Sequence, residues 1–376
     1  MIVGVPREIL PGETRVALAP ESVAKLKGVQ VAVERSAGEA AGFPDDAYQK
    51  AGASVAPDAR SLYGQADLLL KVRPPTPDEA SMLKEGSTLV SMLYPAANLE
   101  TVKRLAARRV TAFALELMPR ISRAQSMDVL SSQATVAGYK AVLMAADSLP
   151  RFFPLLMTAA GTISPARVFV IGAGVAGLQA IATAKRLGAV VCAYDLRPVV
   201  REQIESLGAK FVQLAVEAAD AQDRGGYARA QSEEFYRKQQ ELLAKHVAEA
   251  DAVITTALVP GQKAPTLVPE AGVRGMRPGS VVVDLAAEQG GNCPLTEPGK
   301  SVVKHGVTIH GLLNLPATLA PHASQMFSRN VVAFLLTFLK EGKLAVDDRD
   351  ELVKGTMVVR DGQVIHEPTK KALGVA

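Results

Sequence analysis

The sequence contains no tryptophan, only two cysteines, and no long run of a single sign of charge. Aromatic residues make up 5% of the chain, which is too few for the stacking platforms that bind single-stranded RNA. Cys192 and Cys293 are too few for a disulfide framework, so we expect a reducing compartment. The 42 basic and 38 acidic residues give a net charge of +4 and are scattered, whereas nucleic-acid-binding domains gather Lys and Arg on one face. The composition therefore argues against nucleic acid as a partner.

Long hydrophobic runs are also missing. A membrane-spanning helix needs ~18 or more consecutive apolar residues, and the nearest candidate, residues 331–340, is much shorter. The short apolar start of the chain meets charged residues at once, unlike a signal peptide. With 376 residues, 48% hydrophobic and 21% charged, the chain has the composition of a globular protein of about two domains. We expect no leader and no membrane span.

Short apolar runs rich in β-branched residues alternate with amphipathic segments along most of the chain. This alternation predicts an α/β fold built on parallel sheets. A first series of expected strands comprises residues 2–6, 29–34, 66–72, 87–93 and 110–117. A second series comprises residues 166–172, 189–195, 209–214, 250–258, 279–286 and 307–312. We therefore expect two separate, doubly wound parallel sheets, with Asn98 as the N-cap of a helix over 98–109.

Three segments interrupt this alternation. Residues 118–134 show no period and predict a loop that runs into a helix from Thr135. Residues 215–240 are polar and longer than an ordinary connection, which indicates a mobile loop. The apolar segment 328–343 predicts a helix that we expect to return to the first sheet. The first domain would then be discontinuous, with residues 1–135 and 326–376, and a second domain, residues 136–325, would be inserted into it.

The strongest local signal is a glycine-rich turn that follows an expected strand and opens an expected helix. The spacing G-x-G-x-x-G, followed about twenty residues later by an acid at the end of the next strand, is the dinucleotide-binding fingerprint. The first glycine allows the tight turn, the second lets a pyrophosphate approach the backbone, and the third lets helix and strand pack closely. The residues expected to contact the dinucleotide here are Gly172, Gly174, Val175, Ala176, Gly177, Asp195, Leu196 and Arg197.

Asp195 bears on the choice of dinucleotide. A carboxylate at this strand end accepts a hydrogen bond from the ribose 2′-OH of NAD and disfavours the 2′-phosphate of NADP. Arg197 follows closely, and an Arg nearby can instead accommodate that phosphate. Because the acid stands at the strand end itself, we expect NAD(H) rather than NADP(H).

Longer stretches resemble one family. The segment GVPREILPGETRVALAPE (4–21) is similar to the N-terminal segment shared by alanine dehydrogenases and the NAD(H)-binding component, domain I, of proton-translocating transhydrogenases. The resemblance to the transhydrogenase branch is closest at residues 116–142, 157–189, 254–261 and 284–300, and it runs over almost the whole chain. It implies two Rossmann-like domains and a homodimer. It further implies direct hydride transfer from NADH bound here to NADP⁺ on domain III, a separate chain, coupled to proton movement through a membrane domain, also separate. The location implied is cytoplasmic, peripheral on the inner face of the cell membrane.

The same resemblance assigns further site residues. Those matching the nicotinamide-contacting loop are Arg120, Gln125, Asp128 and Ser131. Those matching the mobile loop and a strand end near the nucleotide are Gly226, Tyr227 and Leu258. Gln125 and Asp128 are expected to position the ring rather than act as acid or base, because hydride transfer between two nicotinamides moves no proton and requires two rings in contact with water excluded. The five histidines lie in no metal-binding or catalytic spacing, so no metal site is expected: His246, His305, His310, His322 and His366.

Two alternatives remain open at this point. In alanine dehydrogenases an Arg and a Lys matching Arg15 and Lys71 bind the oxo-acid. The family's catalytic His is missing from SMLYPAAN (91–98), however, and Glu288 stands in the segment of its catalytic Asp. An amino-acid dehydrogenase needs a general acid/base at the carbon that bears the amine, so this activity is disfavoured, and Arg15 and Lys71 are expected to be relics or structural groups. A non-catalytic NAD-binding module is the other alternative.

Overall fold

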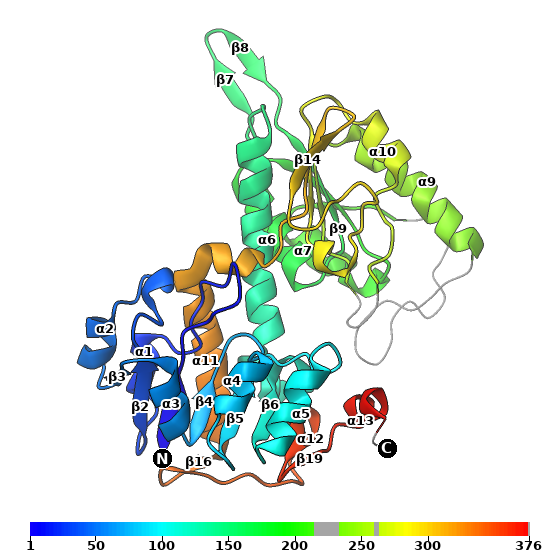
Figure 1. The fold of residues 1–376 in the computed structure, drawn as a ribbon. Coiled ribbons are helices and arrows are strands. Elements are labelled where there is room, and N and C mark those ends of the chain that lie inside the picture. The colour runs from blue at the N-terminus through cyan, green and yellow to red at the C-terminus, as the bar shows by residue number, and fades with distance from the viewer. Residues whose placement is uncertain (214–232, 259–262, 375–376) are drawn as a thin grey trace. The chain divides into compact units, whose positions relative to one another are not determined.

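The computed structural model describes residues 1–213, 233–258 and 263–374, which fall into two compact units (Figure 1). The first unit comprises Met1–Gln133 and Pro316–Ala376, and the second comprises Ala134–Leu315. The sequence placed the return to the first domain at residue 326. That position lies inside one continuous helix, α11 (Ala320–Phe338), so the structure puts the return earlier.

An eight-stranded sheet forms the centre of the first unit, in the order β19-β18-β6-β5-β4-β1-β2-β3. Strands β1 to β6 pair in parallel, and β18 and β19 add an antiparallel edge. The strands are β1 (Ile2–Val5), β2 (Gln30–Glu34), β3 (Ser54–Ala56), β4 (Leu68–Leu70), β5 (Thr88–Ser91), β6 (Thr111–Ala114), β18 (Met357–Arg360) and β19 (Gln363–Val364). The expected parallel α/β architecture is confirmed, while the short edge strand β3 was not predicted.

Helices on both sides of this sheet follow the strand–helix alternation. They are α1 (Pro20–Val23), α2 (Asp45–Lys50), α3 (Ala59–Gln65), α4 (Pro77–Met82), α5 (Leu99–Ala107), α11, α12 (Glu351–Thr356) and α13 (Glu367–Leu373), with a small ribbon of β16 (Leu339–Lys340) and β17 (Lys343–Leu344) after α11. Asn98 precedes α5 as expected but does not cap it. Its side-chain amide instead donates backwards to the carbonyls of Leu93 and Tyr94, at 3.0 Å each.

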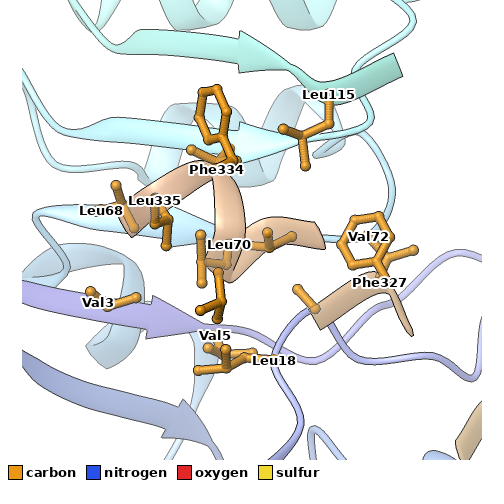
Figure 2. Packing of buried hydrophobic residues seen from close by; sticks show 14 of the residues in the cluster. Val3, Val5, Leu18, Leu68, Leu70, Val72, Leu115, Phe327, Phe334 and Leu335 are labelled. Atoms are coloured by element: carbon orange, nitrogen blue, oxygen red, sulfur yellow. The ribbon is translucent and has the colours of Figure 1, made fainter. Parts of the chain in front are cut away.

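Helix α11 supplies a large part of the first unit's core, in agreement with its apolar sequence. Figure 2 shows Phe327, Phe334 and Leu335 of this helix among the side chains of the sheet. Phe334 packs edge-on against Phe113 of β6, with ring centroids 5.4 Å apart, and against Phe338, 5.2 Å away. The C-terminal part of the chain therefore completes the fold that the N-terminal part begins.

A seven-stranded sheet forms the second unit, in the order β11-β10-β9-β12-β13-β15-β14. All its pairs are parallel except that of the edge strand β14, which was not predicted. The strands are β9 (Arg167–Ile171), β10 (Val190–Tyr194), β11 (Lys210–Phe211), β12 (Ala252–Thr255), β13 (Val281–Asp284), β14 (Ser301–Lys304) and β15 (Val307–His310). The helices are α7 (Val175–Arg186), α8 (Arg201–Ser206), α9 (Glu233–Glu249) and α10 (Glu270–Gly275), and α6 (Val129–Ser148) carries the chain into this unit. No helix within the described ranges is long and apolar enough to cross a bilayer.

A two-stranded hairpin, β7 (Leu156–Thr158) with β8 (Gly161–Ile163), extends away from the seven-stranded sheet (Figure 1). It is paired with neither large sheet. Large apolar side chains on and beside it are exposed, led by Met157 at 76%. The sequence did not predict these strands, because they are short and have no alternating pattern.

Candidate functional site

The second unit has a topological switch point at its sheet centre. The chain order of the strands reverses between the neighbours β9 and β12. In open α/β sheets, dinucleotides bind outside the carboxyl ends of the strands at such a point. Here the turn that begins at Gly172 follows β9, and the segment that ends at Leu258, which is 37% exposed, follows β12.

The glycine turn has the geometry that its sequence predicts. Gly172 has a φ of +94°, and a Cβ there would lie 2.6 Å from Thr256 Oγ1. A Cβ on Gly177 would lie 1.8 Å from the carbonyl oxygen of Gly172, so only glycine lets α7 pack this closely. By contrast, a Cβ on Gly174 would meet nothing within 4 Å.

The open space beside Gly174 lies at the N-terminus of α7. Gly174 is the N-cap of α7 and has no side-chain capping bond, and Gly174 and Val175 are exposed while Ala176 is half-buried. The first amides of a helix lack intrahelical partners and carry partial positive charge, which makes a helix start a binding place for phosphate. The residues present therefore fit a dinucleotide pyrophosphate.

Asp195 directly follows β10 and faces the same turn. Its Oδ2 accepts from the amide of Ala173 at 2.7 Å, which ties the strand end to the glycine turn. Its Oδ1 accepts from the amide of Arg197 at 2.9 Å, and the Arg197 side chain donates from Nε to Oδ1 and from Nη2 to Oδ2, each at 2.9 Å. These bonds raise the pKa of Arg197 above its usual value. The structure thus brings Asp195 and Arg197 together as a bidentate ion pair, while Leu196 between them is half-buried.

The sequence did not predict a second set of residues, which hold the backbone at the carboxyl ends of β9 and β12. Asn292 is fully buried; its Oδ1 accepts from the amide of Ala257 at 3.2 Å, and its Nδ2 donates to the carbonyls of Ala257 and Pro265 at 2.9 and 2.8 Å. Thr256 Oγ1 donates to the carbonyl of Gly172 at 3.1 Å. Asn292 therefore fixes the segment after β12, and that segment in turn holds the glycine turn.

Asp284, at the end of β13, anchors the loop that carries Asn292. Its carboxylate accepts from Thr255 Oγ1 at 2.9 Å, from Thr296 Oγ1 at 2.7 Å and from the amide of Cys293 at 3.0 Å. The sequence did point to this segment, because Asp284 is the first residue of the stretch 284–300 that carries the family resemblance. No rule of residue spacing, however, assigns a role to the individual residues of that stretch.

The expected nicotinamide loop lies in the first unit and is more ordered than its sequence suggests. A short 3₁₀ helix, η3 (Ser122–Met127), contains the exposed Gln125, and Arg120 precedes it, also exposed. Asn330 of α11 donates to the carbonyl of Ser126 at 2.8 Å and so ties η3 to the core helix. The structure thus leaves both Arg120 and Gln125 exposed.

Asp128 and Ser131 have a local structural role that the sequence did not predict. The helix starts at Val129 and not at Thr135, because Asp128 caps it: its carboxylate accepts from the Ser131 amide at 2.9 Å and from Ser131 Oγ at 2.6 Å. Ser131 therefore lies in the first turn of α6 rather than in a loop. Both side chains are half-buried. Gly225, Gly226 and Tyr227, the expected mobile loop, lie outside the described residues.

Arg15 and Lys71 are buried, and both form ion pairs with carboxylates of the same chain. Lys71 follows β4 at the first unit's own switch point, between β1 and β4, and is 1% exposed. Its Nζ lies 3.2 Å from Glu8 Oε2 and 3.0 Å from Glu79 Oε1. Arg15 is 2% exposed and makes a bidentate contact with Glu13, at 2.8 and 2.6 Å, with Gln133 accepting from Nη1 at 2.8 Å.

Glu288 also has a partner within the chain. It lies in a 3₁₀ turn after β13, and its Oε1 accepts from the amide of Asn314 at 2.8 Å. Its carboxylate thus holds the loop at Asn314, a residue with a left-handed φ of +51°.

Comparison with known proteins identifies the family. Models of the alanine dehydrogenase/PNT N-terminal and C-terminal domains match residues 4–137 and 141–367. An NAD(P) transhydrogenase subunit alpha polypeptide of Rhodospirillum rubrum is 51% identical over 376 residues, covering 97% of this chain and 98% of the relative. Alanine dehydrogenase of Bacillus subtilis is 32% identical, covering 100% of this chain and 95% of the relative. A crystal structure of transhydrogenase from Sinorhizobium meliloti superposes with a TM-score of 0.88 at 48% identity, covering 97% of this chain and 100% of that one. The chain, with its two Rossmann-like domains, therefore belongs to the alanine dehydrogenase/PNT family.

Proposed function

We propose that this chain is the NAD(H)-binding subunit of a proton-translocating transhydrogenase. The observation that carries the proposal is the glycine turn of the second unit, which is open at Gly174 and ends at the buried carboxylate of Asp195. The turn and the start of α7 would hold the pyrophosphate, and Asp195 would accept from the adenosine ribose. When bound, NADH supplies the hydride.

The chain's own residues position the reacting ring. Gln125 is exposed and offers a donor and an acceptor to a carboxamide or ribose, and Arg120, which precedes η3 and is also exposed, carries a positive charge. Asp128 would act through α6, whose first turn it caps, as well as by accepting from the ring. Gly226, Tyr227 and Leu258 would cover the bound nucleotide. No proton changes hands at this chain, so none of these groups is an acid or base. The hydride passes directly to NADP⁺ on domain III, a separate chain, and a membrane domain couples the transfer to proton movement.

Alanine dehydrogenase is the alternative within the same family, and the ion pairs of the first unit argue against it. A site for an oxo-acid needs cations that can face a substrate carboxylate. Here Arg15 and Lys71 are buried and already contact Glu13, Glu8 and Glu79. No histidine occupies residues 91–98 to exchange a proton at the amine-bearing carbon.

A homodimer, peripheral on the inner face of the cell membrane, is part of the proposal. The β7–β8 hairpin supports the dimer, because an isolated two-stranded ribbon is at best marginally stable in water. The exposed Met157 and Ile163 of the hairpin, with Leu155 just before it, provide an apolar surface that a second copy would cover. Replacing Met157 by Glu should shift the protein from dimer to monomer in analytical ultracentrifugation, whereas Val303→Glu, at another exposed apolar side chain of the same unit, should not. A Met157→Glu protein that stays dimeric would contradict this role of the hairpin.

The activity test uses two mixtures. The full chain with NADH and an NADP⁺-loaded partner subunit should transfer hydride, read as loss of NADH by a coupled assay. The chain with NADH, pyruvate and ammonia should not. Turnover in the second mixture would favour alanine dehydrogenase, and nucleotide binding without turnover in either would favour a non-catalytic module.

A further inference from the structure

The carboxylate that is expected to bind the ribose is already occupied. Asp195 is 9% exposed and accepts hydrogen bonds from the amides of Ala173 and Arg197 and from Nε and Nη2 of Arg197, at 2.7 to 2.9 Å. An ionised carboxylate offers about four lone-pair sites. A ribose hydroxyl can therefore become a partner of Asp195 only if one of these donors leaves.

The donors differ in how easily they can leave. The amides of Ala173 and Arg197 are held by the backbone of the glycine turn and of the strand end. The guanidinium belongs to a flexible side chain that is 18% exposed. The Arg197 side chain is thus the donor that an incoming hydroxyl would displace.

We propose that the Arg197 side chain competes with the adenosine ribose for Asp195. The guanidinium leaves Asp195 when NAD(H) binds, and while it stays it weakens the preference of the site for NAD(H) over NADP(H). The inference rests on the proposed NAD(H) site and adds a residue that sets its selectivity. The guanidinium neutralises the carboxylate, so the charge that would repel a 2′-phosphate is partly masked. Arg197 is therefore not an aid to NAD(H) binding, although it lies next to the ribose-binding acid.

Removing the Arg197 side chain should leave the Asp195 carboxylate without its ion-pair partner and so change both nucleotide affinities. In Arg197→Met, NADH no longer has to displace the guanidinium and should bind up to about fivefold more tightly, the upper end of the range expected for a partly exposed ion pair. NADPH should bind more weakly, because its 2′-phosphate meets an uncompensated carboxylate. The ratio of the two dissociation constants should widen accordingly. Arg201→Ala is the matched control, since it removes the same charge from the same segment, where Arg201 pairs with Glu205 instead; both affinities should stay as in the wild type.

The experiment measures dissociation constants of NADH and NADPH by titration calorimetry on the full chain, with the melting temperature of each variant recorded without ligand. A second pair of variants keeps the test independent of folding: in an Asp195→Asn background, Arg197→Met should no longer tighten NADH, because the ion pair is already gone. Unchanged or weaker NADH binding by a folded Arg197→Met protein would overturn the inference and leave the proposed function standing. Wild-type protein that binds neither nucleotide would overturn both.

Discussion

Lys71 shows how strongly a single residue of the first unit depends on its partners. Its ammonium lies between Glu8 and Glu79, and Tyr63 donates to the same Glu79 oxygen at 2.8 Å. Burial raises the pKa of Glu8, whereas the two carboxylates raise the pKa of Lys71 although burial opposes its charge. The group depends on all its members, because one buried ammonium is shared by two buried carboxylates.

Lys71→Met should therefore destabilise the first unit by about 3–5 kcal/mol, since it leaves two carboxylates buried without a cation. Lys84→Met is the control: Lys84 pairs with Asp67 at 2.7 Å, but both side chains are exposed, so about 0–1 kcal/mol is expected. Urea unfolding measures both. Equal losses in the two variants would show that the buried cluster contributes no more than a surface pair.

His310 predicts a pH dependence of stability. Its ring lies between Ser148 Oγ, at 2.9 Å, and Ser301 Oγ, at 2.7 Å, and burial lowers its pKa. The unfolded state, with a pKa of about 6.5, then takes up the proton before the folded state does. The buried neutral His310 therefore contributes fully to the free energy of unfolding above about pH 6.5, and this contribution is lost as the pH falls below the unfolded pKa and through the lower folded pKa.

Replacement of His310 by Gln should reduce the loss of stability between about pH 7.5 and 5.5, a window around the unfolded pKa. His246 and His366, whose pKa values burial also lowers, remain in both proteins and provide the common background. The difference between the urea midpoints of the two proteins, followed across pH, isolates His310. A difference independent of pH would contradict the prediction.

At the scale of the element, helix α6 depends on its first residues. Asp128 caps it through Ser131, so the same carboxylate serves the helix and, in the proposed function, the nicotinamide. Two substitutions separate the roles. Asp128→Ala should cost about 0.5–2 kcal/mol, because it removes the cap, whereas Asp128→Asn keeps an acceptor and should stay within a few tenths.

Hydride transfer should fall in both Asp128 variants if the charge positions the ring, and a misplacement of about 1 Å can cost roughly 10²-fold in rate. Asp58→Ala is the matched control, since it removes the cap of α3, where Asp58 accepts from Ser61 at 2.7 Å. It should lose stability without losing rate. An Asp128→Asn protein with the wild-type rate would reduce Asp128 to a helix cap.

Prediction from sequence was most direct where the signal was local. The glycine turn and Asp195 lie within one strand–helix–strand unit, so their spacing predicted the geometry of the turn, and that they bind a dinucleotide stays a prediction. Asn292 contacts Ala257 across 35 residues, and no pattern of either segment encodes that meeting. The start of α6 was misplaced because Asp128, inside the aperiodic stretch 118–134, gave no sign that it caps a helix. Strands β3, β7 and β8 have only three residues each, and β14 has no buried residue, unlike the apolar runs that identified the other strands of its sheet.

At the scale of the whole molecule, the first unit depends on a helix that the chain makes late. Phe334→Ala should destabilise that unit by about 3–5 kcal/mol, because Phe334 is 1% exposed and packs on Phe113 and Phe338. In calorimetry the melting temperature of the first unit should fall. The transition whose melting temperature rises when NADH is added, which belongs to the second unit in the proposed function, should stay where it is. Phe152→Ala, at a side chain that is 54% exposed, should leave both within about 0.5 kcal/mol. A Phe334→Ala protein as stable as Phe152→Ala would mean that α11 adds little to the core.

The discontinuous first unit also constrains how the protein is made. A ribosome adds about 5–20 residues per second, so α11 would emerge about 10–45 s after β6. Throughout that interval the face of the sheet that carries Val5, Leu70 and Phe113 has no α11 to pack on it. The second unit is contiguous and can fold as soon as it has left the exit tunnel. The nascent first unit is thus the part of this protein that chaperones would have to shield.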